Sequence, residues 1–414
     1  MFLGLEVVIG VLALVIVWRL LRWLLVGWWK RPPRPAQPPL SPRHPDKFDG
    51  FEVPSRPWTV ADLVDFEYLL RSDRQVAGAA ALDRDQAIYR ALEKRAPQCL
   101  ADHAYLLRCW LECRRHLGPG YLGGKDVVRA WKLLVTAAVV ASFCIGLVHA
   151  GSVLLLLLDQ GRHVSAPKAV LATVGIQLLM SMLVLCLWLV RRSVKAWYGE
   201  FSSLRVTLVR AILPVLSGRR NRGQFAHCVE QVADAEHSNG PIVFSHIFMA
   251  AQLCVAAMSL GLLVSLNLYH YVSEDLRFGW STTHTVPAEE LHKVTRLVST
   301  PWSALTDLGQ PTLAQVEASR LTRDSPEYTV PAAASGAWVA FISLSIITYG
   351  LLMRLVFAFV AALRTDRLIK RPDFSGPLVD ELLLRLQAGG APRHDPTLRR
   401  PWWRPWGTGR TQNN

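Results

Sequence analysis

Charged residues are scarce in this sequence, and long apolar runs take their place. Only 19% of the 414 residues are charged and 51% are hydrophobic, whereas soluble domains carry about 25% charged residues. The composition therefore excludes an ordinary soluble protein. The 46 Lys and Arg residues exceed the 32 Asp and Glu residues, which gives a net charge of +14. Because the basic residues lie largely beside the apolar runs, we expect them to orient the chain in a membrane and expect no nucleic-acid partner.

Motifs for catalysis or nucleotide binding are absent as well. No HExxH, CxxC, GxSxG or kinase pattern occurs in the chain. The glycine-rich stretch Gly118–Lys125 does not fit a phosphate loop, because Pro119 stands where glycine is required, Asp126 replaces Ser or Thr, and no strand precedes it. Four side chains in a later loop lack metal-site spacing and fit a solvated helix better: His284, Glu289, Glu290 and His292. We therefore expect no enzyme activity, no cofactor and no bound metal.

Five apolar stretches are each long enough to cross about 30 Å of hydrocarbon, which takes about 20 helical residues. They are Phe2–Leu25, Leu133–Leu158, Ala169–Val190, Ile242–Leu268 and Ala337–Leu363. The first stretch has basic residues behind it and none ahead of it, which favours a retained anchor over a cleaved signal peptide. The predicted fold class is an all-α, polytopic helical membrane protein with about five transmembrane helices, a small helical cytoplasmic module and an outside cap.

The distribution of Lys and Arg around the spans predicts their orientation. Basic residues follow the first, third and fifth spans and precede the second, whereas the loop at 267–333 carries five basic and eight acidic residues. One arrangement satisfies all of these flanks: the N-terminus lies outside and the C-terminus lies in the cytoplasm. All seven cysteines then lie within spans or on the cytoplasmic side, which fits a reducing compartment without disulfides.

These features divide the chain into segments with different roles. The predicted order is a transmembrane anchor at 1–29, a Pro-rich basic linker at 30–57, a cytoplasmic helical module at 58–130, the second to fourth spans at 131–266, an outside cap at 267–333, the fifth span at 334–364 and a cytoplasmic tail at 365–414. An amphipathic pattern within 191–240 fits a helix at the membrane surface or one packed on the cytoplasmic module. The tail ends in a basic, Trp-rich stretch, for which contact with anionic lipid is the default interpretation and docking to a partner the alternative.

Small residues recur every four positions in two of the spans. They are Ala138, Ser142, Gly146 and Ala150 in the second span, and Ala257, Gly261 and Ser265 in the fourth. Such stripes let two helices approach closely, so we expect the spans to form a bundle rather than to act as independent anchors.

Five polar or ionisable side chains interrupt the apolar spans: His149, Gln177, His246, Gln252 and Arg354. Hydrogen bonds between helices, worth about 1 kcal/mol each, account for most of them. Arg354 differs from the others because a charge inside the membrane is costly unless it is paired or reaches the interface. Its expected partners are carbonyl groups at the end of the third span, lipid phosphate, or a carboxylate of the cytoplasmic module.

The segment Leu276–Thr283, directly after the fourth span, carries the specific string Phe-Gly-Trp-Ser-Thr-Thr. Further landmarks recur in order along the chain: Asp62–Leu70, Leu82–Ile88, Pro301-Trp302, Pro311, Ser319-Arg320, Trp338 and Tyr349–Arg354. With these residues the chain resembles, over roughly Trp58 to Leu386, the bacterial membrane family catalogued as domain of unknown function 2868. One position departs from the family, which usually has Pro where Met353 stands, so the resemblance does not imply a kink before Arg354.

The resemblance implies no activity, because none is established for the family. Its members are often encoded beside a predicted GTPase, which implies a cytoplasmic GTPase as partner and the bacterial inner membrane as location. We therefore expect a non-enzymatic scaffold or sensor that contacts membrane lipid and docks a cytoplasmic partner. A channel or transporter subunit is the alternative, and it would require a continuous polar path through the spans.

The candidate functional or structural residues gather around the family landmarks. They are Phe278, Gly279, Trp280, Ser281, Thr282, Thr283, Trp302, Arg320, Tyr349 and Arg354. Phe278, Trp280 and Trp302 are bulky apolar residues in an otherwise polar loop, so we expect them to pack together over the fourth and fifth spans.

Overall fold

The computed structural model describes residues 54, 57–74, 78–117, 122–159, 163–175, 177–179, 181–182, 186, 240–272, 277–281, 286–321, 329–372, 374 and 376–388. The predicted anchor at 1–29, most of the linker at 30–57, nearly all of the amphipathic segment at 191–240 and the end of the tail from residue 389 lie outside these residues.

The chain forms two compact units. The first consists of Met1–Gln37, Thr59–Val64 and Gly123–Asp373, and the second of Pro38–Trp58, Asp65–Leu122 and Phe374–Asn414. The second unit therefore combines residues from the predicted cytoplasmic module with residues from the predicted tail, although these segments are far apart in the sequence.

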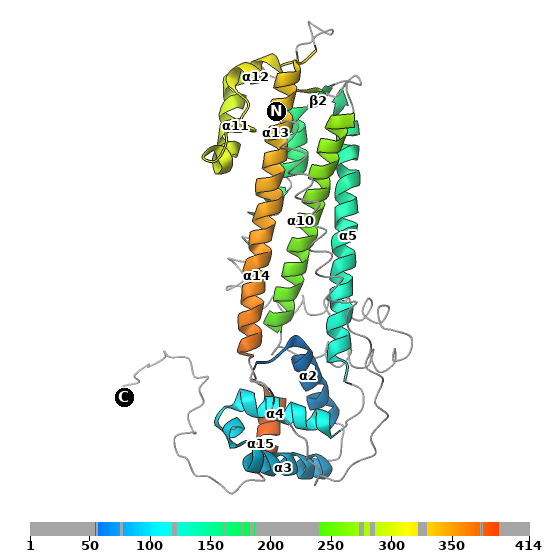
Figure 1. Ribbon diagram of the computed structural model, residues 1–414, viewed down its shortest axis with the longest axis vertical. Helices are drawn as coiled ribbons and strands as arrows, with labels where there is room; N and C mark the ends of the chain where they lie inside the picture. Colours follow the sequence, from blue (N-terminus) through cyan, green and yellow to red (C-terminus); the bar gives the residue numbers. More distant parts are fainter. Residues whose placement is uncertain are drawn as a thin grey trace, which may run out of the picture. The chain divides into compact units, whose positions relative to one another are not determined.

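Three long apolar helices form the frame of the first unit, hereafter the membrane unit. Two of them are α5 (Gly124–Leu157) and α10 (Gly240–Val272). The third is one continuous helix that consists of α13 (Ala332–Ser345), the π-helical segment η4 (Ile346–Leu352) and α14 (Met353–Lys370). The helix α10 packs against both α5 and α14 and is therefore the central member (Figure 1).

The length and composition of these helices indicate a membrane protein. Three stretches are long and apolar enough to cross a bilayer: Gly124–His149, Pro241–Val272 and Ala332–Lys370. They correspond to the second, fourth and fifth predicted spans. Within the described residues the third predicted span is represented by a shorter apolar helix, Ala166–Leu179, and the first predicted span lies outside them.

The helices α5 and α10 meet backbone to backbone at two glycines. A Cβ atom on Gly146 would overlap the carbonyl oxygen of Met258, and a Cβ atom on Gly261 would overlap the carbonyl oxygen of Phe143. Only glycine permits this approach, which lets the two helices gain dispersion contacts along their length. The predicted close contact between the small-residue stripes of these spans is confirmed at this crossing.

A small sheet lies next to the ends of α5 and α10 (Figure 1). Its strands are β1 (Leu158–Asp159), β2 (His163–Ser165) and β3 (Arg277–Gly279), in the order β1-β2-β3. The pair β1–β2 is antiparallel and the pair β2–β3 is parallel, so that Val164 lies opposite Phe278. The predicted all-α class is thus correct for most described residues but omits this sheet. Strands of two or three residues are too short to show the alternation by which a sequence reveals a strand.

The membrane unit also contains α6 (Ala166–Val170), the π-helical segment η2 (Leu171–Gly175), α11 (Ala288–Ser303) and α12 (Leu313–Ala318). The last two lie in the predicted cap and pack against α13 (Figure 1). Thr312 and Gln315 form a reciprocal capping box that starts α12.

The second unit is a group of packed helices. Its elements are the residues of α2 (Val60–Arg74) from Asp65 onward, α3 (Gly78–Arg95), the 3-10 helix η1 (Pro97–Ala101), α4 (His103–His116) and α15 (Pro377–Gln387). Asp102 starts α4, because its side chain accepts a hydrogen bond from the backbone N–H of Ala104. The helix α15 packs against α3.

Candidate functional site

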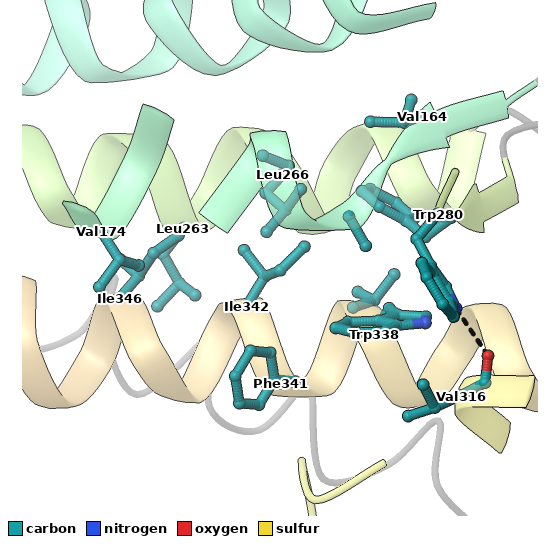
Figure 2. Close-up of a cluster of buried hydrophobic side chains, with 14 of the residues drawn as sticks. Val164, Val174, Leu263, Leu266, Trp280, Val316, Trp338, Phe341, Ile342 and Ile346 are labelled. Atoms are coloured by element: carbon teal, nitrogen blue, oxygen red, sulfur yellow. Dashed lines mark hydrogen bonds between the residues drawn. The ribbon is translucent and has the colours of Figure 1, made fainter. Parts of the chain in front are cut away.

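A cluster of buried aromatic and aliphatic side chains joins the cap to the spans. Phe278 and Trp280 are fully buried, and Trp302 is nearly so. They share one core with Leu263 and Leu266 of α10 and with a group from the long third helix: Trp338, Phe341, Ile342 and Ile346 (Figure 2). The predicted packing of these three aromatic residues over the fourth and fifth spans is confirmed.

Hydrogen bonds fix Trp280 within this core. Its indole Nε1 donates to the carbonyl oxygen of Val316 at 2.7 Å (Figure 2), and its backbone N–H donates to the carbonyl oxygen of Ser319 at 3.0 Å. The hydroxyl of Ser319 in turn accepts from Nε1 of Trp338 at 2.9 Å. The indole N–H groups of both tryptophans are therefore satisfied inside the core, as burial of a Trp side chain requires.

The neighbours of Trp280 are held equally closely. The N–H of Phe278 donates to the hydroxyl of Ser335 at 2.9 Å. A Cβ atom on Gly279 would lie only 3.0 Å from the carbonyl oxygen of Ser319, so that glycine allows β3 to approach the chain after α12. The guanidinium of Arg320 lies 5.3 Å from the ring centroid of Trp280, within the range of a cation–π contact.

The remaining candidates of this group have different positions. Ser281 is exposed, and Thr282 and Thr283 lie outside the described residues. The hydroxyl of Tyr349 donates to the carbonyl oxygen of Val298 at 2.8 Å, which ties the third long helix to α11. Residues that are distant in sequence thus converge here, and they form a packed core whose evident role is to hold the cap on the spans.

Arg354 occupies a second site, in the middle of the third long helix. It is 2% exposed. One terminal nitrogen donates to Oε1 of Gln252 at 3.1 Å, and the other donates to the carbonyl oxygen of Gln177 at 3.0 Å. A carbonyl of the third predicted span is thus a partner, but it belongs to Gln177 in the first half of that span, whereas the prediction named carbonyls at its end. Among the described residues, no carboxylate forms an ion pair with Arg354.

Two small residues make room for the side chain of Gln177. The hydroxyl of Ser259 donates to Oε1 of Gln177 at 3.1 Å. A Cβ atom on Gly350 would overlap that same oxygen. The polar group consisting of Gln177, Gln252, Ser259, Gly350 and Arg354 is hereafter the arginine cluster. Sequence reasoning identified the two glutamines and the arginine separately but missed Ser259 and Gly350.

The arginine cluster belongs to a polar seam on α10. Ser245, Gln252 and Ser259 follow each other at intervals of seven residues and are all buried, as expected for one face of a helix that packs along a neighbour. At one end of the seam, Ser245 donates to the carbonyl oxygen of Ala361 at 3.1 Å and accepts from Thr365 at 2.7 Å.

Two π-helical segments border the arginine cluster. The segment η4 contains Gly350 and ends just before Arg354, and η2 ends two residues before Gln177. The two segments pack against each other. π-Helical turns are rare and are found frequently at functional sites. No residue pattern in the sequence predicted them.

Buried charges in the second unit form a different kind of cluster. Asp73 pairs with Arg84 at 2.6 Å and with Arg114 at 2.8 Å. Asp85 accepts hydrogen bonds through Oδ1 from Arg84 and from Trp110. Its second oxygen lies 3.3 Å from Nε of Arg385, an ion-pair distance without hydrogen-bond alignment. Burial lowers the pKa of Arg114, and Asp73 and Asp85 oppose this effect.

Three cysteines lie in the core of the same unit. The sulfur atoms of Cys99 and Cys109 are 2.7 Å apart, and Cys113 is also fully buried. Burial raises the pKa of the Cys109 thiol, and it raises that of Cys113 to about 12. Thiols with such pKa values stay protonated at neutral pH and are therefore weak nucleophiles and metal ligands. In the described part of the chain, no group of three His, Cys, Asp or Glu residues has an arrangement that could hold a metal ion.

The C-terminal part of the chain matches a known protein family. Residues 216–397 match the family described as Protein of unknown function (DUF2868). The resemblance carried by the Phe-Gly-Trp-Ser-Thr-Thr string is thereby confirmed. The DUF2868 region contains the aromatic core residues of the cap, Arg354 and α15, whereas Gln177 and the landmarks between Asp62 and Ile88 lie outside it. No curated protein and no solved structure matches the chain.

Proposed function

We propose that the protein is a non-enzymatic membrane scaffold or sensor that docks a cytoplasmic partner. One observation carries the proposal: a single continuous helix, Ala332–Lys370, begins at the residues that pack against the cap and ends shortly before the chain enters the second unit. Its first turns bury Trp338 in the aromatic core of the cap, and its middle holds Arg354. After six intervening residues, the chain enters α15 of the second unit at Pro377.

The orientation that we propose places the cap outside and the second unit in the cytoplasm of a bacterium, with about five spans in the inner membrane. Three basic residues close the last turns of the third long helix, Arg364, Arg367 and Lys370, which favours a cytoplasmic location for that end. A tag within 267–333 should be accessible on intact cells, whereas tags near Ser72 and at Asn414 should be protected. Labelling of the Ser72 tag from outside would contradict this orientation.

The partner that we propose for the second unit is a cytoplasmic GTPase, in line with the gene neighbourhood that the family resemblance implies. Support comes from the way α15 joins this unit. Leu382 and Leu386 of α15 are fully buried, and Arg385 faces Asp85. A change at the end of the third long helix would therefore reach a helix that is built into the proposed docking unit.

The experiment is a pull-down from detergent-solubilised membranes, analysed by mass spectrometry. Wild type is compared with Arg354→Leu, and the exposed Arg367→Met on the same helix serves as control. We expect both variants to insert into the membrane and only Arg354→Leu to change partner recovery. Equal recovery from wild type and Arg354→Leu at matched protein levels would reduce Arg354 to a residue without a role in docking.

A channel or transporter subunit is the second candidate, and the polar seam on α10 favours it. Ser245, Gln252 and Ser259 place polar groups at three depths along the central helix, and all of them are buried. Ion flux across proteoliposomes that contain the purified protein tests this alternative. Flux that disappears on substitution of Gln252 by Leu would support a transport role over a scaffold role.

A further inference from the structure

The charge balance of the arginine cluster is incomplete. Arg354 is buried, yet its two partners in the described residues, Gln252 and Gln177, are neutral. A charged side chain near the centre of a bilayer costs about 2.5–3.5 kcal/mol on insertion scales, and more in other estimates. Hydrogen bonds to amide oxygens offset part of this cost but do not neutralise the charge.

The cluster carries a positive charge and unused N–H donors. Nε of Arg354 and Nε2 of Gln177 are buried without a hydrogen-bond partner. By contrast, Oε1 of Gln252 accepts from Arg354, and Oε1 of Gln177 accepts from Ser259. The guanidinium repels a metal cation, and free N–H groups can bind only an acceptor, so the charge and the donors of this cluster favour an anion.

The position of Arg354 along its helix indicates whether the anion is a lipid phosphate or a dissolved ion. Arg354 precedes Arg364 by ten residues, which is about 15 Å along a helix and half of the hydrocarbon thickness. The headgroup phosphate of a lipid remains at the interface and lies too far away. A dissolved ion of one negative charge balances the single guanidinium and needs only a few N–H donors.

We propose that Arg354 and Gln177 form a binding site for a small monovalent anion, tested here as chloride, between the π-helical segments η2 and η4. The guanidinium supplies the charge and the Gln177 amide supplies a second donor. Ser259 and Gly350 position the Gln177 side chain, and Gln252 holds the guanidinium. The site is a property of the membrane unit and does not depend on the proposed docking function.

Thermal unfolding of the full-length protein in detergent tests the site. Sodium chloride is exchanged for sodium gluconate at constant ionic strength, because gluconate is too large for the cluster. A ligand that binds only the folded state raises its stability with concentration. We expect the melting temperature of wild type to rise by about 2–4 °C in chloride and to saturate. An equal melting temperature in both salts would overturn the proposal.

Three variants assign the effect to the cluster. Arg354→Met should lose the chloride response, Gln177→Leu should weaken it at least tenfold in chloride concentration, and Arg367→Met on the exposed side of the same helix should retain it. A response that persists in Arg354→Met would locate the ion elsewhere and refute the site.

A direct measurement keeps the proposal testable if a variant fails to fold. Chloride NMR lines broaden when the ion exchanges with a protein site, and wild type alone suffices for this experiment. Bromide should compete for the site, whereas sulfate, with two charges and a larger radius, should not. Competition by sulfate that equals that of bromide would indicate a surface ion and would contradict a buried monovalent site.

Discussion

The two units of the protein bury charge in opposite ways. In the second unit, Asp73 lies between Arg84 and Arg114, and Asp85 faces both Arg84 and Arg385. In the membrane unit, the hydrogen-bond partners of the buried Arg354 among the described residues are neutral amide groups. A buried charge with a counter-charge contributes mainly to a defined structure, whereas a buried charge without one is expensive and is expected where it serves a function. We therefore expect the aspartate network to stabilise the fold of the second unit and the arginine cluster to serve the function of the membrane unit.

A second difference lies within the membrane unit and concerns packing. The cap core around Trp280 and the contact of α5 with α10 at Gly146 and Gly261 are closely fitted: the indole N–H groups of Trp280 and Trp338 are hydrogen-bonded, with only that of Trp302 unpaired among the three tryptophans of the core, and the helix backbones touch. The arginine cluster lies among two π-helical segments and contains unpaired donors. Substitutions in the fitted regions should therefore lower stability, and the effect should decrease toward the cluster.

The largest loss of stability is expected for Trp280→Ala. The side chain is fully buried, and its removal leaves a cavity and one hydrogen bond fewer on the carbonyl oxygen of Val316, which keeps the bond from the Ser319 hydroxyl. We expect the free energy of unfolding to fall by about 3–5 kcal/mol. Thermal unfolding in detergent measures the change, and the exposed neighbour Ser281→Ala should stay within about 0.5 kcal/mol of wild type. An unchanged melting temperature of Trp280→Ala would mean that the cap core is not fitted as described.

Asp73→Ala is expected to have the next largest effect, in the second unit. It leaves Arg84 and Arg114 without their shared carboxylate, and breaking a buried pair costs about 3–5 kcal/mol. We expect the free energy of unfolding to fall by about 3 kcal/mol, the lower end of this range, because the Arg84 side chain is 21% exposed and keeps part of its hydration. The rate at which the buried thiols become alkylated reports opening of this unit.

Asp366→Ala is the matched control for the aspartate network. Its partner is Lys370, at 2.6 Å, but both side chains are more than half exposed. Such pairs are worth about 0.3–0.5 kcal/mol. Equal alkylation rates in Asp73→Ala and Asp366→Ala would remove the distinction between a structural network and a surface pair.

The sequence predicts those parts of this architecture that depend on local periodicity or on residue size. Length and hydropathy located the helices α5, α10 and α13–α14, and small residues at every fourth position located the contact near Gly261. The sheet and the π-helical segments were missed, because a strand of three residues has no visible alternation and a π-helical turn has the same composition as an α-helical one. The pairing of Arg354 with Gln177 was also not specified, since 177 residues separate them in the chain.

Gly261→Ala should lower stability less than Trp280→Ala or Asp73→Ala. The added Cβ atom would overlap backbone atoms of Phe143 and Leu147, so the helices α5 and α10 must separate. Overpacking of this kind costs about 1–3 kcal/mol. Gly336→Ala on α13 is the control, because nothing lies within 4 Å of its added Cβ atom and alanine favours a helix. A loss of stability in Gly336→Ala as large as in Gly261→Ala would show that helix contact is not the cause.

Apart from the surface controls, the smallest loss of stability is expected at Arg354. A small loss at Arg354 and a large loss at Asp73 would distinguish the buried charges of the two units. In sodium gluconate, Arg354→Met should change the free energy of unfolding by no more than about 1 kcal/mol, because an apolar side chain of similar length replaces a buried cation that lacks a counter-charge. Gln252→Leu should lower the free energy of unfolding by about 1–3 kcal/mol, because it removes the acceptor of one terminal nitrogen of the guanidinium. The double variant should then resemble Arg354→Met alone, since no charge is left to require the amide. If Arg354→Met instead destabilises the protein as much as Asp73→Ala does, the cation is a structural element like the arginines of the second unit, and the assignment of function to the arginine cluster fails.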